Sequence, residues 1–343
     1  MVGDVAMSDA LVLAGAVAKG AFSAGALAVL SEPDTKARLG LDITRVVGAS
    51  SGALNGVYYA AAIRAGAEAF AGHRLAQIWL DDATIRGAFD FSLHDVVGGL
   101  GLSSDVRLLH LLREHIQPCA GRQPVDVRVV VTNANGEPVS VGGRPATTFE
   151  HVVAMSSHDF DTAESLERVF VAVAASAALP GIYAPVPIEL GGRTVQGMDG
   201  GIVDDAPLGH ALEGAPDVAR VFVCVPFPRV RTEPANRHGL ALAWHVFDLL
   251  VQERLVRDLR RVVHANHVLE RLPSIVADPA ERAAVVDALG LTGRRPVEIV
   301  EIRPDVDLPG SDFSAFTSVG LRRQYVEAGI EAARRVVASS MGS

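Results

Sequence analysis

Short apolar runs alternate with helix-like segments along most of the chain. The continuous apolar runs at 10–14, 127–131 and 221–225 predict strands covered on both faces, because a strand with one wet face would alternate with polar residues. This alternation is typical of an α/β protein with a central, mostly parallel sheet and helices on both faces. The predicted strands are 10–14, 43–47, 127–131, 221–225 and 296–302, and the predicted helices are 21–30, 51–65, 102–116, 164–178, 240–272 and 319–337.

The composition favours a large folded unit over disorder or nucleic-acid binding. Of 343 residues, 49% are hydrophobic and 21% are charged, which is enough apolar material for a sizeable core. The formal net charge is −9, whereas a nucleic-acid binder normally carries a basic face. Cys119 and Cys224 are too few to build a disulfide framework, so a reducing compartment is the simpler interpretation.

Hydrophobicity near the N-terminus raises the question of a membrane segment. The most apolar stretch, residues 5–30, is interrupted by Asp9 and Lys19, and no run of 18 uncharged, strongly apolar residues occurs. The first ten residues carry Asp4 and Asp9 but no Lys or Arg, unlike the basic start of a secretory signal. We therefore expect a cytoplasmic protein without a transmembrane helix.

The sharpest local signal is the pentapeptide G-A-S-S-G at residues 48–52. It follows a predicted strand and precedes a predicted helix, which is the context of a nucleophile elbow. Such a turn needs small residues beside the serine, here Gly48 and Gly52, and it pushes the hydroxyl outward. The helix N-terminus behind it favours negative charge developing on a substrate. Ser50 is thus the candidate nucleophile, and Ser51 is interpreted as the first residue of the helix.

A second signal is the loop G-A-V-A-K-G at residues 15–20, between the first predicted strand and its helix. It does not end in Gly-Lys-Ser/Thr as a phosphate-binding P-loop would, because Ala21 follows Gly20. A dinucleotide fingerprint would need glycine where Val17 stands. Backbone amides that lead into a helix suit an oxyanion hole instead, where they would stabilise a tetrahedral intermediate on Ser50.

A third signal is the turn G-M-D-G-G at residues 197–201. Asp199 is followed by Gly200 and Gly201, so no side chain blocks the approach of its carboxylate to another group. On its own, however, the Asp-Gly pair fits an ordinary turn aspartate equally well.

The three signals together resemble the signature of the patatin-like phospholipases. That family carries a glycine-rich loop with Lys or Arg after the first strand, then G-x-S-x-G, then D-G-G or D-G-A far downstream. Here Ser50 and Asp199 are 149 residues apart. Segments 174–185 and 204–208 are similar to those that flank the family's aspartate. The resemblance implies a single patatin-like domain, with the catalytic core at 8–225 and a C-terminal helical and strand part of the same domain at 226–340.

The resemblance also implies a lipid acyl hydrolase with a Ser–Asp dyad. Ser50 would form the acyl-enzyme and Asp199 would be the general base, which requires burial because an ordinary carboxyl pKa near 4 is too low. The implied partner is a lipid substrate at a membrane or micelle surface, met transiently, with no metal or other cofactor; the oligomeric state is open. The other implied site residues are Gly15, Ala16 and Val17 as the oxyanion hole, Lys19 and Gly20 as loop support, and Gly48, Gly52, Gly200 and Gly201 in the elbow and the aspartate turn.

One departure from the family keeps alternatives open. Ala16 and Val17 replace glycines in the oxyanion loop, and a β-branched residue such as valine resists positive φ. The alternatives are an α/β-hydrolase-type esterase with a Ser–Asp–His triad, using His210 or His238, and a non-catalytic lipid- or nucleotide-binding protein. His264 and His267, three residues apart on a predicted helix, are interpreted as surface residues, because no nearby carboxylate completes a metal site.

Overall fold

The computed structural model describes residues 7–84, 87, 106–121, 123–230, 240–311 and 313–340. Within these ranges the strands form one eight-stranded sheet in the order β5-β6-β3-β2-β1-β7-β8, with β4 paired to β3 beside this path. The strands are β1 (Ser8–Leu13), β2 (Ile43–Ala49), β3 (Asp126–Val141), β4 (Arg144–Met155), β5 (Val186–Leu190), β6 (Arg193–Met198), β7 (Val218–Cys224) and β8 (Glu298–Ile302).

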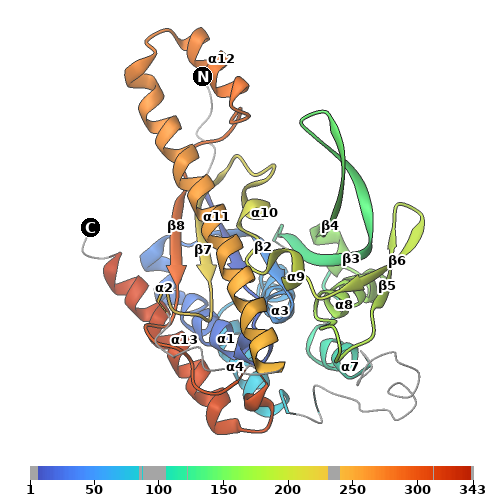
Figure 1. The fold of residues 1–343 in the computed structure, drawn as a ribbon. Helices are drawn as coiled ribbons and strands as arrows, with labels where there is room; N and C mark the ends of the chain where they lie inside the picture. The colour runs from blue at the N-terminus through green and yellow to red at the C-terminus, as the bar shows by residue number, and fades with distance from the viewer. Residues whose placement is uncertain are drawn as a thin grey trace.

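The sheet has a parallel half and an antiparallel half. β1 lies in the middle and pairs in parallel with β2 and β7, and the parallel pairings continue to β3 and β8. Beyond β3 the sheet turns antiparallel, through β3–β4, β3–β6 and β5–β6. The long β3–β4 hairpin projects from the body of the protein (Figure 1). The predicted α/β fold is confirmed, with a mixed sheet.

Helices cover both faces of the sheet. Side chains of β1 alternate, so Leu11 and Leu13 enter one core cluster while Ala10 and Val12 enter the other. The first cluster lies under α1, α3, α4, α8 and α13, and the second lies under α10 and α11. The helices are α1 (Gly20–Leu30), α2 (Pro33–Leu39), α3 (Ser51–Ala65), α4 (Ala71–Asp81), α7 (Val106–His115), α8 (Ala163–Ser176), α9 (Gly201–Asp204), α10 (Leu208–Leu212), α11 (Leu240–Ile275), α12 (Pro279–Ala288) and α13 (Val319–Ser339), with 3₁₀ turns η1 (Val17–Lys19), η2 (Ser157–Phe160) and η3 (Ser314–Phe316).

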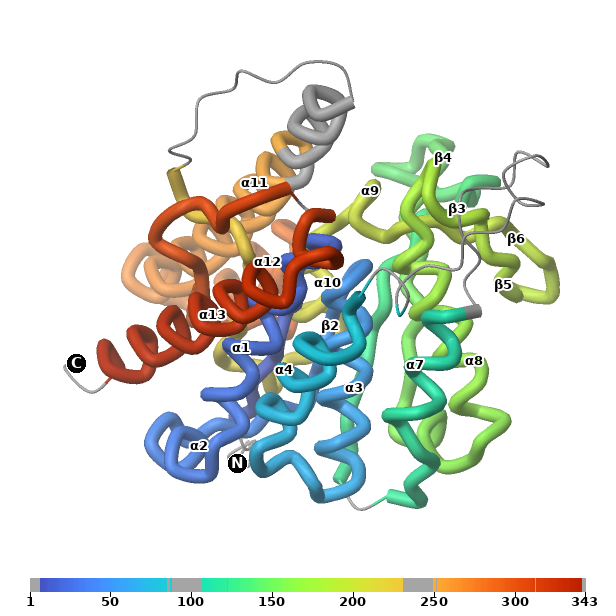
Figure 2. Tube along the Cα trace, turned by 90° about the horizontal axis from the view of Figure 1, so that it is seen from below, coloured from blue at the N-terminus to red at the C-terminus, as the bar shows by residue number. Residues whose placement is uncertain are grey.

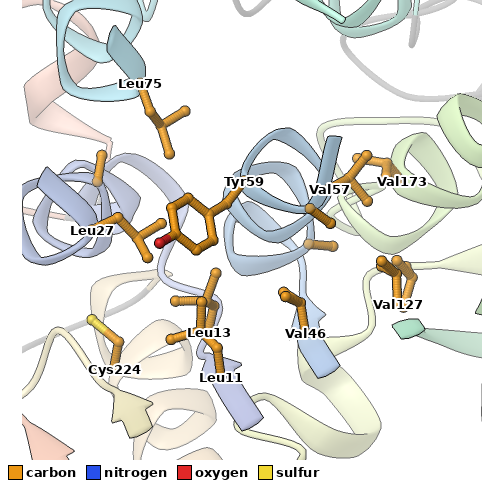
Figure 3. Close-up of a cluster of buried hydrophobic side chains, with 14 of the residues drawn as sticks. Leu11, Leu13, Leu27, Val46, Val57, Tyr59, Leu75, Val127, Val173 and Cys224 are labelled. Carbon is orange, nitrogen blue, oxygen red and sulfur yellow. The ribbon is translucent and has the colours of Figure 1, made fainter. Parts of the chain in front are cut away.

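The larger core cluster joins the three central strands to the helices that follow them. Figure 3 shows the ring of Tyr59 on α3 pointing toward Leu27 on α1, above Leu13 on β1. All three side chains are buried. This packing holds α1 and α3 against the central strand β1.

The C-terminal helix α13 packs against α1, although the two are far apart in the sequence (Figure 2). A Cβ atom at Gly25 would lie 2.0 Å from the Val326 carbonyl oxygen, and one at Gly329 would lie 2.0 Å from the Phe22 carbonyl oxygen. The two helix backbones therefore touch, and only glycine permits this approach.

Most of the predicted elements are present, and the unpredicted strands all lie in the antiparallel half. The predicted helix 51–65 coincides with α3, and the predicted strands 10–14 and 43–47 lie within or next to β1 and β2. The predicted helix 102–116 corresponds to α7, but its first residues lie outside the described part of the chain. The strands β4, β5 and β6 and the helices α2, α4 and α12 were not predicted. Among the described helices, none combines the length and apolarity needed to cross a membrane.

Candidate active site

Ser50 stands in a sharp turn between β2 and α3. β2 ends at Ala49 and α3 begins at Ser51, and between them Ser50 has φ 51° and ψ −127°. The turn is tight, because a Cβ at Gly52 would lie 2.1 Å from the Leu13 carbonyl oxygen. The structure thus places G-A-S-S-G in the strand–turn–helix geometry that exposes a nucleophile.

A buried hydroxyl at the end of α8 supports this turn. The Ser50 amide donates to Ser176 Oγ at 2.9 Å, and Ser176 Oγ donates to the Val130 carbonyl oxygen on β3 at 2.6 Å. Ser176 is fully buried at the end of α8. Sequence reasoning did not single it out, because a serine at a helix end carries no motif of its own.

Asp199 reaches Ser50 from the antiparallel half of the sheet. β6 ends at Met198, which pairs with Thr132 of β3, and Thr132 Oγ1 donates to the Asp199 carbonyl oxygen at 2.7 Å. The carboxylate then accepts two hydrogen bonds, from Ser50 Oγ to Oδ2 at 2.6 Å and from the Gly201 amide to Oδ1 at 2.8 Å. Two residues 149 positions apart are therefore in direct contact.

Burial gives this carboxyl an unusual acidity. Asp199 is 3% exposed, and the loss of solvent raises its pKa to about 6, although the hydrogen bonds from Ser50 and Gly201 act in the opposite direction. A carboxylate with this pKa accepts a proton much more readily than an exposed aspartate while staying ionised at neutral pH.

The loop 15–20 lies directly against the elbow. The Gly15 amide donates to the Asp205 carbonyl oxygen at 3.2 Å, and the Ala16 amide donates to Ser51 Oγ at 3.0 Å. Val17 has φ 50°, so it adopts the conformation that a valine was expected to resist. Two of the three expected oxyanion donors are thus already engaged by the protein itself.

Lys19 and Gly20, at the end of this loop, face different neighbours. Lys19 is 9% exposed, and its Nζ lies 5.5 Å from the ring centre of Phe227, beyond the end of β7. Gly20 begins α1, and a Cβ there would lie 2.8 Å from both Ser51 and Trp79. Lys19 therefore lies on the β7 side of the loop, and Gly20 packs closely against the α3 side.

The candidate triad histidines lie elsewhere or outside the described residues. His210 contacts Glu150 and Glu213, and hydrogen bonding to these carboxylates outweighs burial, so the His210 pKa is raised. His238 falls outside the described part of the chain. The Asp199 carboxylate has Ser50 and Gly201 as its hydrogen-bond partners within that part.

Donor atoms of Glu150, Asp204 and His210 lie within 4.8 Å of one another, close enough for a metal site. Arg254 of α11 already contacts Glu150, and its Nη2 lies 3.4 Å from Asp204 Oδ2. Burial raises the pKa of Asp204 to about 7, although the positive charge of Arg254 lowers it. The arrangement is an internally compensated ion cluster. His264 and His267 are exposed on α11.

An apolar cavity opens beside Ser50 and Asp199. Its walls come from α3, α4, α7 and η3, and the dyad and Val17 lie at its lining. His115, at the end of α7, also lines it and contacts Asp82 Oδ2 at 3.1 Å. Sequence reasoning missed this histidine, since it stands in no recognised motif. The large apolar side chains that line the cavity are Leu54, Tyr58, Leu75, Ile78, Trp79, Leu108, Leu111, Leu112, Ile116, Leu179, Tyr183, Phe313 and Phe316.

Ser50, Asp199 and the loop 15–20 fall within a match to a known protein family. The family model described as patatin-like phospholipase matches residues 11–212. A crystal structure of VipD from Legionella pneumophila is 13% identical, with a TM-score of 0.38, and the alignment covers 98% of this chain and 67% of the VipD chain. No curated protein matches the chain significantly.

Because the family model covers more than half of the chain, this chain belongs to the patatin-like phospholipases. The resemblance inferred from the three motifs is confirmed, and with it the patatin-like fold. Patatin-like phospholipases act on lipid substrates as acyl hydrolases, and the family assignment supports that general activity here.

Proposed function

We propose that this protein hydrolyses carboxylic esters of lipids through an acyl-enzyme on Ser50, with Asp199 as the general base. The observation that carries the proposal is the 2.6 Å hydrogen bond that Ser50 Oγ donates to Asp199 Oδ2. The residue that accepts it, Asp199, is only 3% exposed. A nucleophile and a base within hydrogen-bond reach are what this chemistry requires.

Acyl transfer on this dyad takes two steps. As Ser50 Oγ attacks the ester carbonyl carbon, Asp199 Oδ2 accepts the hydroxyl proton, and the carbonyl oxygen becomes an oxyanion. When the tetrahedral intermediate collapses, the C–O bond to the leaving alcohol breaks and Asp199 returns the proton to that alcohol. Water then attacks the acyl-enzyme with Asp199 again accepting a proton, and the fatty acid leaves while Ser50 regains its hydrogen.

The cavity beside the dyad supports a fatty acyl substrate. Its walls are dominated by leucine, isoleucine and aromatic side chains, and its few polar members include Ser50, Asp199 and the His115–Asp82 pair. An apolar lining of this kind favours a hydrocarbon chain and excludes water from the reacting groups. Membrane contact would then be peripheral, through delivery of one acyl chain into this cavity.

The test combines covalent labelling with two substitutions. A fluorophosphonate should modify Ser50, with the adduct located by mass spectrometry. Ser50→Ala should abolish labelling, and Asp199→Asn should lower kcat on nitrophenyl esters at least about 1,000-fold, since the amide cannot accept the proton. His210→Ala serves as the control, and its activity should stay close to that of the unmodified protein.

Two outcomes would overturn the proposal. Full activity in Ser50→Ala would remove this serine from the mechanism. A loss in His210→Ala as large as that in Asp199→Asn would favour a triad over the dyad.

A further inference from the structure

Backbone strain is concentrated at this site. Among the described residues, three that are not glycine have positive φ, namely Val17, Ser50 and Phe70. Val17 and Ser50 line the same cavity as Asp199. For a β-branched residue this conformation is costly, and it persists only where the surroundings impose it. The elbow explains Ser50, so Val17 requires a separate cause.

The neighbouring hydroxyl of Ser51 provides that cause. Ser51 Oγ accepts the Ala16 amide at 3.0 Å, and both groups are buried. The chain then turns back, because the Lys19 amide donates to the Ala16 carbonyl oxygen at 2.9 Å. Ala16 is thereby held through both its amide and its carbonyl, and Val17 forms the bend between these two anchors.

The same contacts determine which backbone amides of the loop are still available to donate a hydrogen bond to a substrate. Gly15 donates to the Asp205 carbonyl oxygen and Ala16 donates to Ser51 Oγ. Within the described part of the chain, the Val17 amide donates to no protein acceptor. Since Val17 also lines the cavity with Ser50, it is the loop residue whose amide can meet an oxyanion there.

We propose that Ser51 is a positioning residue, which binds the Ala16 amide and so orients the Val17 amide as the loop's oxyanion donor. This inference rests on the proposed hydrolysis at Ser50. It narrows the expected set of donors, because Gly15 and Ala16 then hold the loop rather than contact the substrate. It also assigns a role to Ser51, the second serine of G-A-S-S-G.

The experiment compares three serine variants. Ser51→Ala removes the acceptor and should lower kcat about 10- to 100-fold with KM within about twofold, because a misplaced donor affects the transition state more than the bound ester. Ser51→Thr keeps a hydroxyl and should recover most of the rate. The matched control is Ser31→Ala, since Ser31 Oγ is also buried and accepts a backbone amide, that of Gly72 at 3.1 Å, away from the cavity.

Amide hydrogen exchange gives a readout that needs no catalysis. The peptide covering residues 14–20 should exchange faster in Ser51→Ala than in the unmodified protein, and Ser51→Thr should restore its protection. Unchanged exchange in Ser51→Ala would overturn the inference even if the rate fell. An unchanged kcat would overturn it as well, whatever the exchange.

Failure of the proposed function would look different. In that case the unmodified protein would neither hydrolyse esters nor react with a fluorophosphonate. If only the role of Ser51 is wrong, the unmodified protein still hydrolyses and Ser51→Ala is labelled at the same rate. If both proposals hold, labelling of Ser51→Ala goes to completion at Ser50, but slowly.

Discussion

At the scale of single residues, Asp199 has no charged partner among the residues that the structure describes. Its carboxylate is held by a hydroxyl and a backbone amide, and burial raises its pKa from 3.8 to about 6. Because one pKa unit corresponds to about 1.4 kcal/mol, keeping this group ionised at neutral pH destabilises the folded state by roughly 3 kcal/mol. The group proposed to accept the proton therefore weakens the fold.

Asp199→Asn should consequently make the protein inactive and more stable. A folded-state pKa above the unfolded value stabilises the native protein fully below about pH 4, and this stabilisation is lost as pH rises through about 6. Asparagine does not titrate, so the stability advantage of the variant should grow by roughly 3 kcal/mol between pH 4 and pH 8. Urea denaturation of both proteins across this range measures it. An advantage that does not change with pH would contradict the raised pKa.

Single residues also show what the sequence could and could not predict. Ser50 and Asp199 stand in short motifs, and the structure brings both together as predicted, while their roles stay proposals. The hydrogen bond from the Ala16 amide to Ser51 Oγ joins residues 35 positions apart, and no sequence motif indicates it. For the same reason the positive φ of Val17 could not be anticipated. A proline substitution at Val17 would not test the amide alone, because the proline ring also forces φ from 50° to near −65°.

At the scale of elements, the parallel half of the sheet was predictable and the antiparallel half was not. β1 is wholly buried, and its residues 10–13 appear in the sequence as an uninterrupted apolar run. β5 and β6 are short, and most of their positions are partly or fully exposed, so they carry little pattern. The strand that presents Asp199 was therefore not predicted, and only the turn that follows it was recognised.

Another element, η3, supplies Phe316 to the cavity from beyond the residues matched by the family model. Phe316→Ala should raise KM for long-chain esters about tenfold and leave acetyl esters nearly unaffected, because a long acyl chain buries far more apolar surface against the cavity wall than an acetyl group does. Hydrolysis of a chain-length series of nitrophenyl esters measures this. Phe149→Ala, at an exposed position on β4, is the control. An equal loss on all esters would show that Phe316 supports the fold and not the chain.

At the scale of the whole molecule, contact between α1 and α13 joins the two ends of the chain. Gly329→Ala would force a methyl group into the Phe22 carbonyl oxygen, so it should destabilise the protein by about 2 kcal/mol or more. Gly320→Ala lies in the same helix, where the nearest atom to a new methyl group is Ser318 Oγ at 3.6 Å, and should be neutral or slightly stabilising. Urea midpoints of both variants test the difference.

The same measurement bears on the domain organisation. A core at 8–225 with 226–340 as part of the same domain stays a prediction. One cooperative transition that moves as a whole in Gly329→Ala would support it, whereas a separate early transition would show that the C-terminal part unfolds independently.

Assembly of the dyad across the sheet has a consequence for folding kinetics. Ser50 follows β2 and Asp199 follows β6, and β3 lies between these strands. The two side chains can meet only after β3 has paired with both neighbours in register, Gly48 with Val129 on one side and Met198 with Thr132 on the other. Helices form within microseconds, whereas pairing between distant strands is slow. In a refolding chain the return of helical signal would mark the beginning of folding, and the return of ester hydrolysis its end.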